Sequence, residues 1–364
     1  ILLGISPVEL GGAPFALTTD AAVEVPAVEL DLKINGGGRI YILPCIAGHV
    51  GADTAGVILA EEPQNQDSMT LLVDVGTNAE IVLGNRHRLL ACSSPTGPAF
   101  EGAQISCGQR AAAGAIERVR IDPQTLQPRF KVIGSDLWSD EDGFAEAIVG
   151  HGVTGICGSG IIEVVAEMYL AGIVTVDGII DGELSSRTER VIQNDRTWSY
   201  VLHSPENDEV PIVVTQNDIR QIQLAKAALY AGVKLLMDHI GTETVERIRL
   251  AGAFGSHINV QHAMVLGLIP DAVLEQVSSA GNAAGTGARI ALLNLQSRDT
   301  IENLVNNIEK IETAMESKFQ DYFVDAMAFP NKTDPFPNLF NVISRPEPKI
   351  LAENTAGGRK RRRR

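Results

Sequence analysis

The fold is decided by one stretch of the sequence, Leu71-Leu72-Val73-Asp74-Val75-Gly76-Thr77-Asn78-Ala79-Glu80. An apolar run ends at Asp74, and Gly76-Thr77-Asn78 then leads into a second β-rich run. Glycine permits the backbone angles of a tight turn, and such a turn can direct several N–H groups and a hydroxyl toward one point. The stretch therefore predicts a β-hairpin whose turn is either an ordinary connection or a cradle for phosphate.

A phosphate cradle at this turn needs a cation. The carboxylate of Asp74 repels phosphate oxygens unless a positive charge lies between them, and Mg²⁺ prefers oxygen ligands and keeps several waters. We therefore expect Mg²⁺ near Asp74.

Strand and helix signals continue on both sides of this hairpin. Apolar runs bounded by Gly, Asn or Pro predict strands, and apolar residues at helical spacing predict helices. The predicted strands are residues 39–43, 71–74, 80–83, 88–92, 212–214 and 247–250, of which 71–92 form an antiparallel meander. The predicted helices are residues 55–60, 156–170, 281–295 and the helix that a capping box at Thr215 and Asp218 opens and Gly241 ends. Residues 300–323 carry an apolar stripe at helical spacing that indicates core packing, and residues 1–35 are expected to be irregular.

Two further segments are candidates for ligand contact. Leu250-Ala251-Gly252-Ala253-Phe254-Gly255 follows a predicted strand. Its glycines either let a flat group such as adenine or ribose approach the backbone, or serve tight strand-to-helix packing. Gly51-Ala52-Asp53-Thr54 precedes a predicted helix, and on its own Asp53 is best interpreted as an N-cap.

The order of these motifs resembles the second half of the superfamily that contains acetate and sugar kinases, heat-shock chaperones and actin. The order begins with Asp53-Thr54, continues with the Asp74 hairpin and the Gly252 segment, and ends with Gly281-Asn282-Ala283-Ala284-Gly285-Thr286-Gly287. The resemblance implies an α/β fold, an actin-like or ribonuclease H-like ATPase lobe with a mixed sheet flanked by helices. It assigns residues 1–60 to the end of a first lobe and a connecting segment, residues 61–330 to the second lobe, and residues 331–364 to an irregular to disordered tail.

Longer strings over about residues 1–330 are similar to the reductive activators of corrinoid proteins. The strings are Ile46 to Thr54, Thr96-Gly97-Pro98-Ala99-Phe100-Glu101-Gly102, Gly155-Ile156-Cys157-Gly158-Ser159-Gly160 and the two segments that begin at Leu250 and Gly281. That family joins a [2Fe–2S] domain to a two-lobed nucleotide-binding domain, and ATP hydrolysis drives the reduction of a Co(II) corrinoid protein to Co(I). The C-x₄-C-x₂-C run and the first-lobe phosphate hairpin are absent from this sequence. The chain is therefore interpreted as the C-terminal portion of an activator, with an ATPase site that is incomplete on its own.

The resemblance also implies roles for individual residues. The residues that it assigns to phosphate and nucleotide binding are Asp74, Gly76, Thr77, Asn78, Gly252, Ala253, Phe254 and Gly255. Asp53 would orient the attacking water, and Glu101 is a second candidate for a catalytic carboxylate. The implied cofactors are ATP and Mg²⁺, the latter held by Asp74 through water, with [2Fe–2S] only in the part of the parent protein that this chain lacks.

The resemblance implies a cytoplasmic protein whose partners are a corrinoid protein or its methyltransferase and an electron donor, with a homodimer as a further option. Two alternatives remain open. One is a small-molecule kinase of the same superfamily, and the other is a non-enzymatic docking module for a corrinoid or methyltransferase partner. Kinase activity would favour the first alternative, and partner binding without nucleotide affinity would favour the second.

Composition and charge argue against a membrane-spanning protein and against some classes of partner. The chain has 364 residues, 45% of them hydrophobic and 21% charged, as in ordinary soluble proteins, and no apolar run is long enough to span a membrane. A net charge of −15 argues against nucleic acid or membrane as a partner of the body, whereas the basic end Arg359 to Arg364 is either a solvated tail or a separate anion-binding block.

Cysteine and histidine spacing gives no metal site. The four cysteines contain no C-x₂-C pair and are expected to be free, buried thiols. No pair of histidines has the spacing of haem or cobalt ligands, although His49 and His257 lie within the motif segments.

Overall fold

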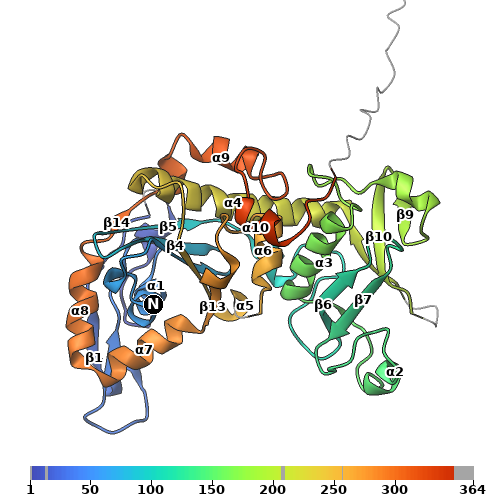
Figure 1. The fold of residues 1–364 in the computed structure, drawn as a ribbon. Coiled ribbons are helices and arrows are strands. Elements are labelled where there is room, and N and C mark those ends of the chain that lie inside the picture. The colour runs from blue at the N-terminus through green and yellow to red at the C-terminus, as the bar shows by residue number, and fades with distance from the viewer. Residues whose placement is uncertain (1, 13–14, 206–209, 256, 348–364) are drawn as a thin grey trace, which may run out of the picture.

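The computed structural model describes residues 2–12, 15–205, 210–255 and 257–347 (Figure 1). A larger half built around a sheet lies beside a smaller outer half, and one long helix extends along both. No helix in these ranges is long and apolar enough to cross a membrane.

The helices and strands follow one another throughout the chain. The helices are α1 (Ala52–Glu61), α2 (Phe144–Ala147), α3 (Gly158–Leu170), α4 (Gln216–Ile240), α5 (Gly252–Gly255), α6 (Val260–Leu266), α7 (Ala283–Leu293), α8 (Leu295–Val305), α9 (Phe319–Asp325) and α10 (Pro337–Val342). The strands are β1 (Val23–Pro26), β2 (Arg39–Ile42), β3 (Thr70–Val75), β4 (Ala79–Asn85), β5 (Arg88–Ser94), β6 (Ala115–Ile121), β7 (Pro128–Val132), β8 (Gly155–Ile156), β9 (Val191–Asn194), β10 (Thr197–His203), β11 (Ile212–Thr215), β12 (Arg247–Ala251), β13 (Val277–Gly281) and β14 (Glu309–Lys310).

The larger half contains a mixed sheet with helices on both faces, as predicted. The strand order is β13-β12-β3-β4-β5-β14, in which β13, β12 and β3 are parallel and β3, β4 and β5 are antiparallel. Side chains alternate along β3, so that Leu71 packs in the cluster that includes α4 and Leu72 packs in the cluster that includes α1 and α7. The meander over residues 71–92 is confirmed. Its first turn, Gly76 to Asn78, connects β3 to β4.

Helix α4 begins and ends where the sequence predicts. Thr215 and Asp218 form the capping box, with the Thr215 N–H donating to Asp218 Oδ2 at 2.8 Å, and Gly241 closes the helix with φ of 79°. In its middle, Gly232 lies so close to β4 that a Cβ there would be 2.8 Å from Ile81 Cδ1. Helix α4 thus starts beside β10 and β11 in the outer half, and this close approach lets its later part cover the sheet.

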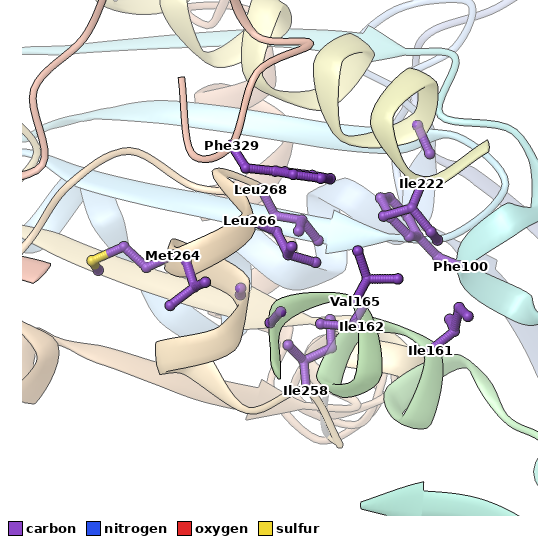
Figure 2. Packing of buried hydrophobic residues seen from close by; sticks show 14 of the residues in the cluster. Phe100, Ile161, Ile162, Val165, Ile222, Ile258, Met264, Leu266, Leu268 and Phe329 are labelled. Carbon is purple, nitrogen blue, oxygen red and sulfur yellow. The ribbon is translucent and has the colours of Figure 1, made fainter. Parts of the chain in front are cut away.

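The outer half consists of two small sheets, β7-β6-β8 and β11-β10-β9, with α2 and α3. Only α3 and β11 were predicted from the sequence. Figure 2 shows where this half joins the rest of the molecule: Ile162 and Val165 of α3 lie toward α6 and Phe329, and Ile161 lies on the side of Phe100. The two halves therefore share one hydrophobic core.

The stripe over residues 300–323 is not one helix. Helix α8 ends at Val305, after which β14 pairs with the edge of β5 through Leu90 and Ala91. Asn306 and Asn307 follow the helix, and asparagine is a poor helix former because its side chain competes for backbone hydrogen bonds. The stripe still supplies core residues in its first part, but not at Met315, which is 84% exposed.

The two ends of the chain are more regular than expected. Residues 1–35 contain β1, which pairs with β2. In the predicted tail, α10 docks through Leu339, which is fully buried, and Asp271 accepts hydrogen bonds from the backbone N–H groups of Asn338 and Leu339, each at 3.0 Å. Residues 348–364, with the basic end, lie outside the described residues.

Candidate functional site

The β3–β4 turn exposes backbone donors. The Gly76 N–H donates to Asn78 O at 3.0 Å, and the Thr96 hydroxyl donates to Gly76 O at 2.9 Å. The Gly97 N–H donates to Thr77 O at 2.8 Å. The carbonyl oxygens of Gly76, Thr77 and Asn78 therefore all accept hydrogen bonds within the protein. Within the described ranges, the N–H groups of Thr77 and Asn78 have no hydrogen-bond partner. A turn in this state can receive an anion.

Thr77 and Glu101 are brought together at this turn. The Thr77 hydroxyl donates to Glu101 Oε1 at 2.7 Å, and both residues are exposed. The carboxylate therefore orients a side chain of the turn. Its exposure also leaves it free to contact solvent or a ligand.

Three carboxylates gather where β3 ends. Asp74 lies directly across the antiparallel pair from Glu80, and Asp53 in the first turn of α1 is close enough to act on both. Burial, and then the nearby charge of Asp53, raises the pKa of Asp74. Burial, followed by the charges of Asp53 and Asp74, raises the pKa of Glu80 to about 7. The Ser93 hydroxyl, 3.4 Å from Glu80 Oε1, offsets this negative charge only in part.

Asp53 is not the N-cap of α1. Gly51 occupies the cap position, and Asp53 Oδ1 instead accepts the N–H of Thr54 at 2.9 Å. The carboxylate is exposed and faces the same region as Asp74 and Glu80. The interpretation as a simple cap is therefore wrong, and a role at the site is left open to Asp53.

The Gly252 segment lies beside Asp74. Ala251 at the end of β12 pairs with Asp74 of β3, and the next residues, Gly252 to Gly255, form the single turn α5. Gly252 has φ of 89°, and a Cβ on it would lie 2.5 Å from Asp74 Oδ1. Ala253 and Phe254 belong to this turn through their backbone. The predicted phosphate and adenosine segments are thus adjacent in space.

The segment that begins at Gly281 leads into α7, which packs against α1, the helix that carries Asp53. Asn282 caps α7 by accepting the Gly285 N–H at 2.9 Å. A Cβ on Gly287 would lie 1.9 Å from Gly56 O, so the glycines of this motif let α7 cross α1 with the backbones in contact. The crossing fixes α1, and with it the position of Asp53.

Glu80 is the residue that the sequence analysis missed. The signal was present, because two strands joined by a tight turn place residues at equal distances from the turn opposite each other. With the turn at Gly76 to Asn78, Glu80 must pair with Asp74.

The described residues contain no group of three or more His, Cys, Asp or Glu side chains arranged to hold a metal ion. His49 is exposed and packs against Phe15 with ring centres 4.6 Å apart, while His257 accepts a hydrogen bond through its carbonyl. The four cysteines are free, and Cys92 and Cys157 are buried while the other two are half-buried.

Comparison with known proteins places this site in a family context. A family model described as the C-terminal domain of RACo, the ASKHA domain, matches residues 68–340, and one described as the RACo middle region matches residues 1–66. The chain is 33% identical over 337 residues to the corrinoid activation enzyme RamQ of Eubacterium limosum, covering 90% of this chain and 54% of the relative. It is 25% identical over 330 residues to the Co(II) methylated amine-specific corrinoid protein reductase of Methanosarcina barkeri, covering 87% of this chain and 57% of that protein.

A solved structure supports the same family assignment. A reductive activator for corrinoid, iron-sulfur protein matches with a TM-score of 0.78 and 33% sequence identity, covering 94% of this chain and 52% of the solved one. The chain thus spans about half the length of the relatives that it matches.

Proposed function

The chain belongs to the RACo family of reductive activators of corrinoid proteins, with an actin-like ASKHA domain, and from this premise we propose that it binds ATP and Mg²⁺ at the β3–β4 turn. The observation that carries the proposal is the contact between Asp74 and Gly252 beside two N–H groups that have no partner among the described residues. A phosphate site and an adenosine-facing segment meet there. The alternatives of a small-molecule kinase and a docking module are not favoured by these relatives.

Each residue of the site would have its own role in nucleotide binding. The N–H groups of Thr77 and Asn78 would donate to phosphate oxygens, Gly76 would give them room, and Gly252 to Gly255 would pack on the adenosine. Asp53 would hold a water by accepting its hydrogen bond, and it would take up the proton as the water attacks.

A divalent cation bound mainly through water needs no group of three side-chain ligands, and the carboxylate of Asp74 can serve it. The pKa values of Asp74 and Glu80 are raised because their negative charges are buried and face Asp53. Mg²⁺, held by Asp74 through water, would supply positive charge there and offset the repulsion between these carboxylates and phosphate. Oxygen ligands with few direct protein bonds are typical of Mg²⁺ bound together with nucleotides.

We infer for the whole protein that ATP hydrolysis drives electron transfer to a corrinoid partner. One electron would pass from an electron donor, through a [2Fe–2S] centre outside this chain, to Co(II), which becomes Co(I). Closing of the nucleotide site and its reopening after hydrolysis would supply the two states that such coupling needs. A corrinoid protein or its methyltransferase would be the docking partner.

Calorimetric titration of this chain with ATP and with ADP in the presence of Mg²⁺ tests the nucleotide site. We expect micromolar binding that Asp74→Ala abolishes. Asp67→Ala is the matched control, because Asp67 is an aspartate paired with Arg86 on the surface, with 78% of its side chain exposed. Absence of binding to the unaltered chain, or equal binding by both variants, would refute the assignment of the site to this lobe.

A further inference from the structure

A buried ionic cluster joins the outer half to the segment that follows Gly252 to Gly255. Its centre is Glu163 on α3, which is fully buried, and beside it lie Glu167 on the same helix and His262 on α6. His262 is only 3% exposed, and its Nε2–H donates to Glu167 Oε1 at 2.8 Å. A buried carboxylate is tolerated only where charges and hydrogen bonds compensate it.

Strand β6 provides that compensation for Glu163. The Arg118 Nη1 lies 2.8 Å from Glu163 Oε1, and the Arg120 Nη1 lies 2.6 Å from Glu163 Oε2. The Val119 N–H also donates to Glu163 Oε2 at 3.0 Å. Glu163 is fully buried, so water does not compete for its carboxylate oxygens. It therefore holds the guanidinium groups of Arg118 and Arg120 in fixed positions.

The two arginines contact different groups beyond the cluster. The same Nη1 group of Arg118 donates a second hydrogen bond to the carbonyl oxygen of His257, at 3.1 Å. Arg120 has a nearly equal exposed fraction, 36% against 35%, but its further partners are Val119 O, Glu167 at 3.9 Å and the Trp138 ring, whose centre is 5.9 Å from the guanidinium carbon. The contact with His257 thus distinguishes two otherwise similar side chains.

The residues after His257 continue the anchoring of this segment. Ile258 is 7% exposed and lies next to Ile162 of α3 in Figure 2. Asn259 caps α6, because its Oδ1 accepts the His262 N–H at 3.1 Å. Residues 257–259 are therefore held at three successive positions, by a guanidinium, by the core and by a helix cap.

We propose that Arg118 is a positioning residue for nucleotide binding: it fixes residues 257–259, and through them the Gly252 to Gly255 turn, in the place where the adenosine is received. The role in nucleotide binding rests on the proposed function. The physical basis is that Glu163 immobilises the guanidinium, so that the carbonyl of His257 is held relative to α3. Loss of the guanidinium frees the carbonyl while the hydrophobic contacts of Ile258 remain.

Hydrogen–deuterium exchange without nucleotide tests the positioning itself. Arg118→Met removes the bond to His257, and Arg120→Met is the matched control, since each variant removes one positive charge from the same carboxylate. We expect amides of residues 252–255 and 257–263 to exchange about tenfold faster in Arg118→Met than in Arg120→Met, as for the loss of a hydrogen bond from a charged donor. Equal exchange in the two variants would overturn the proposal.

Calorimetry with ATP and Mg²⁺ tests the consequence for the ligand. In Arg118→Met we expect about tenfold weaker binding, and in Arg120→Met binding within about twofold of the unaltered chain, at matched losses of thermal stability. Equal affinities would overturn the link to the ligand. If the unaltered chain binds no ATP, the proposed function fails, whereas the exchange comparison still decides whether Arg118 positions the segment.

Discussion

Gly252 and Asp74 touch across neighbouring parallel strands. Gly252 follows the last residue of β12, Asp74 is the next-to-last residue of β3, and a Cβ on Gly252 would lie 2.5 Å from Asp74 Oδ1. Gly252 also has φ of 89°, where side chains are rarely found. The geometry of the carboxylate therefore depends on the absence of a side chain at this glycine.

Gly252→Ala is expected to weaken ATP binding about tenfold, because the added methyl must displace the Asp74 carboxylate. Gly241→Ala is the control: Gly241 has a similar φ of 79°, but nothing lies within 4 Å of the Cβ that would be added. Both variants should lose about 1 kcal/mol of unfolding free energy through backbone strain. Calorimetry of both should show that only Gly252→Ala loses affinity. If Gly252→Ala binds ATP like the unaltered chain, the contact is unrelated to the site.

Glu80 makes stability depend on pH. Burial raises its pKa to about 7 from the ordinary value of 4.5, so the folded state retains a proton that the unfolded state releases. The stabilisation is complete below about pH 4.5 and is lost as the pH rises through 7. Glu80 should therefore lower the free energy of unfolding by about 2 kcal/mol between these limits.

Urea unfolding at several pH values, in EDTA, measures this dependence. Glu80→Gln should flatten the profile between pH 4.5 and 8, and at pH 8 it should be more stable than the unaltered chain. Glu146→Gln, at an exposed site on α2, should leave the profile unchanged. A profile for Glu80→Gln that parallels the unaltered one would show that Glu80 is not buried among negative charges.

Local signals explain which parts of the fold were predictable. The meander and α4 are marked by residues next to each other in the chain, such as the Gly76 turn and the Thr215 cap, and they form as predicted. The β3–β4 turn and the Gly252 segment were also recognised as motifs. That they are adjacent depends on the pairing of β12 with β3, which joins residues far apart in the sequence.

Non-local pairing explains the failures. Helix α10 is stabilised by Asp271, which lies far from it in the chain. Residues 306–310 leave the helical pattern because the edge of β5 offers a backbone partner to β14. Glu80 is the opposite case, since its position opposite Asp74 followed from the turn alone.

Lys226 holds the segment before α10 from within α4. Its side chain is fully buried, burial keeps its pKa well below the ordinary range, and its Nζ donates to the carbonyls of Ala328 and Pro330. Lys226→Met leaves both carbonyls without a donor, and we expect a loss of about 3 kcal/mol in urea unfolding.

Lys234→Met is the matched control on the same helix. Lys234 is 21% exposed and forms a single ion pair, 3.1 Å from Asp334, so its loss should cost about 1 kcal/mol. The variant keeps the Ala328 and Pro330 bonds intact. Equal effects of the two substitutions would mean that the carbonyls bound by Lys226 find other donors.

Substitutions at Thr77 and Glu101 separate two effects of the Glu101 carboxylate on ATP binding. One effect is to accept the Thr77 hydrogen bond, and the other is to place a negative charge near the phosphates. Thr77→Val removes the 2.7 Å bond that orients the turn, and ATP should bind about fivefold more weakly. Glu101→Gln retains an oxygen that can accept the Thr77 hydroxyl but removes a negative charge near the phosphates. ATP should therefore bind about threefold more tightly at low salt, and the gain should disappear at high salt. Glu243→Gln, at an exposed position after α4, is the control in the same calorimetric series. Weaker binding by Glu101→Gln would instead mean that its charge, and not only its acceptor oxygen, is needed at the turn.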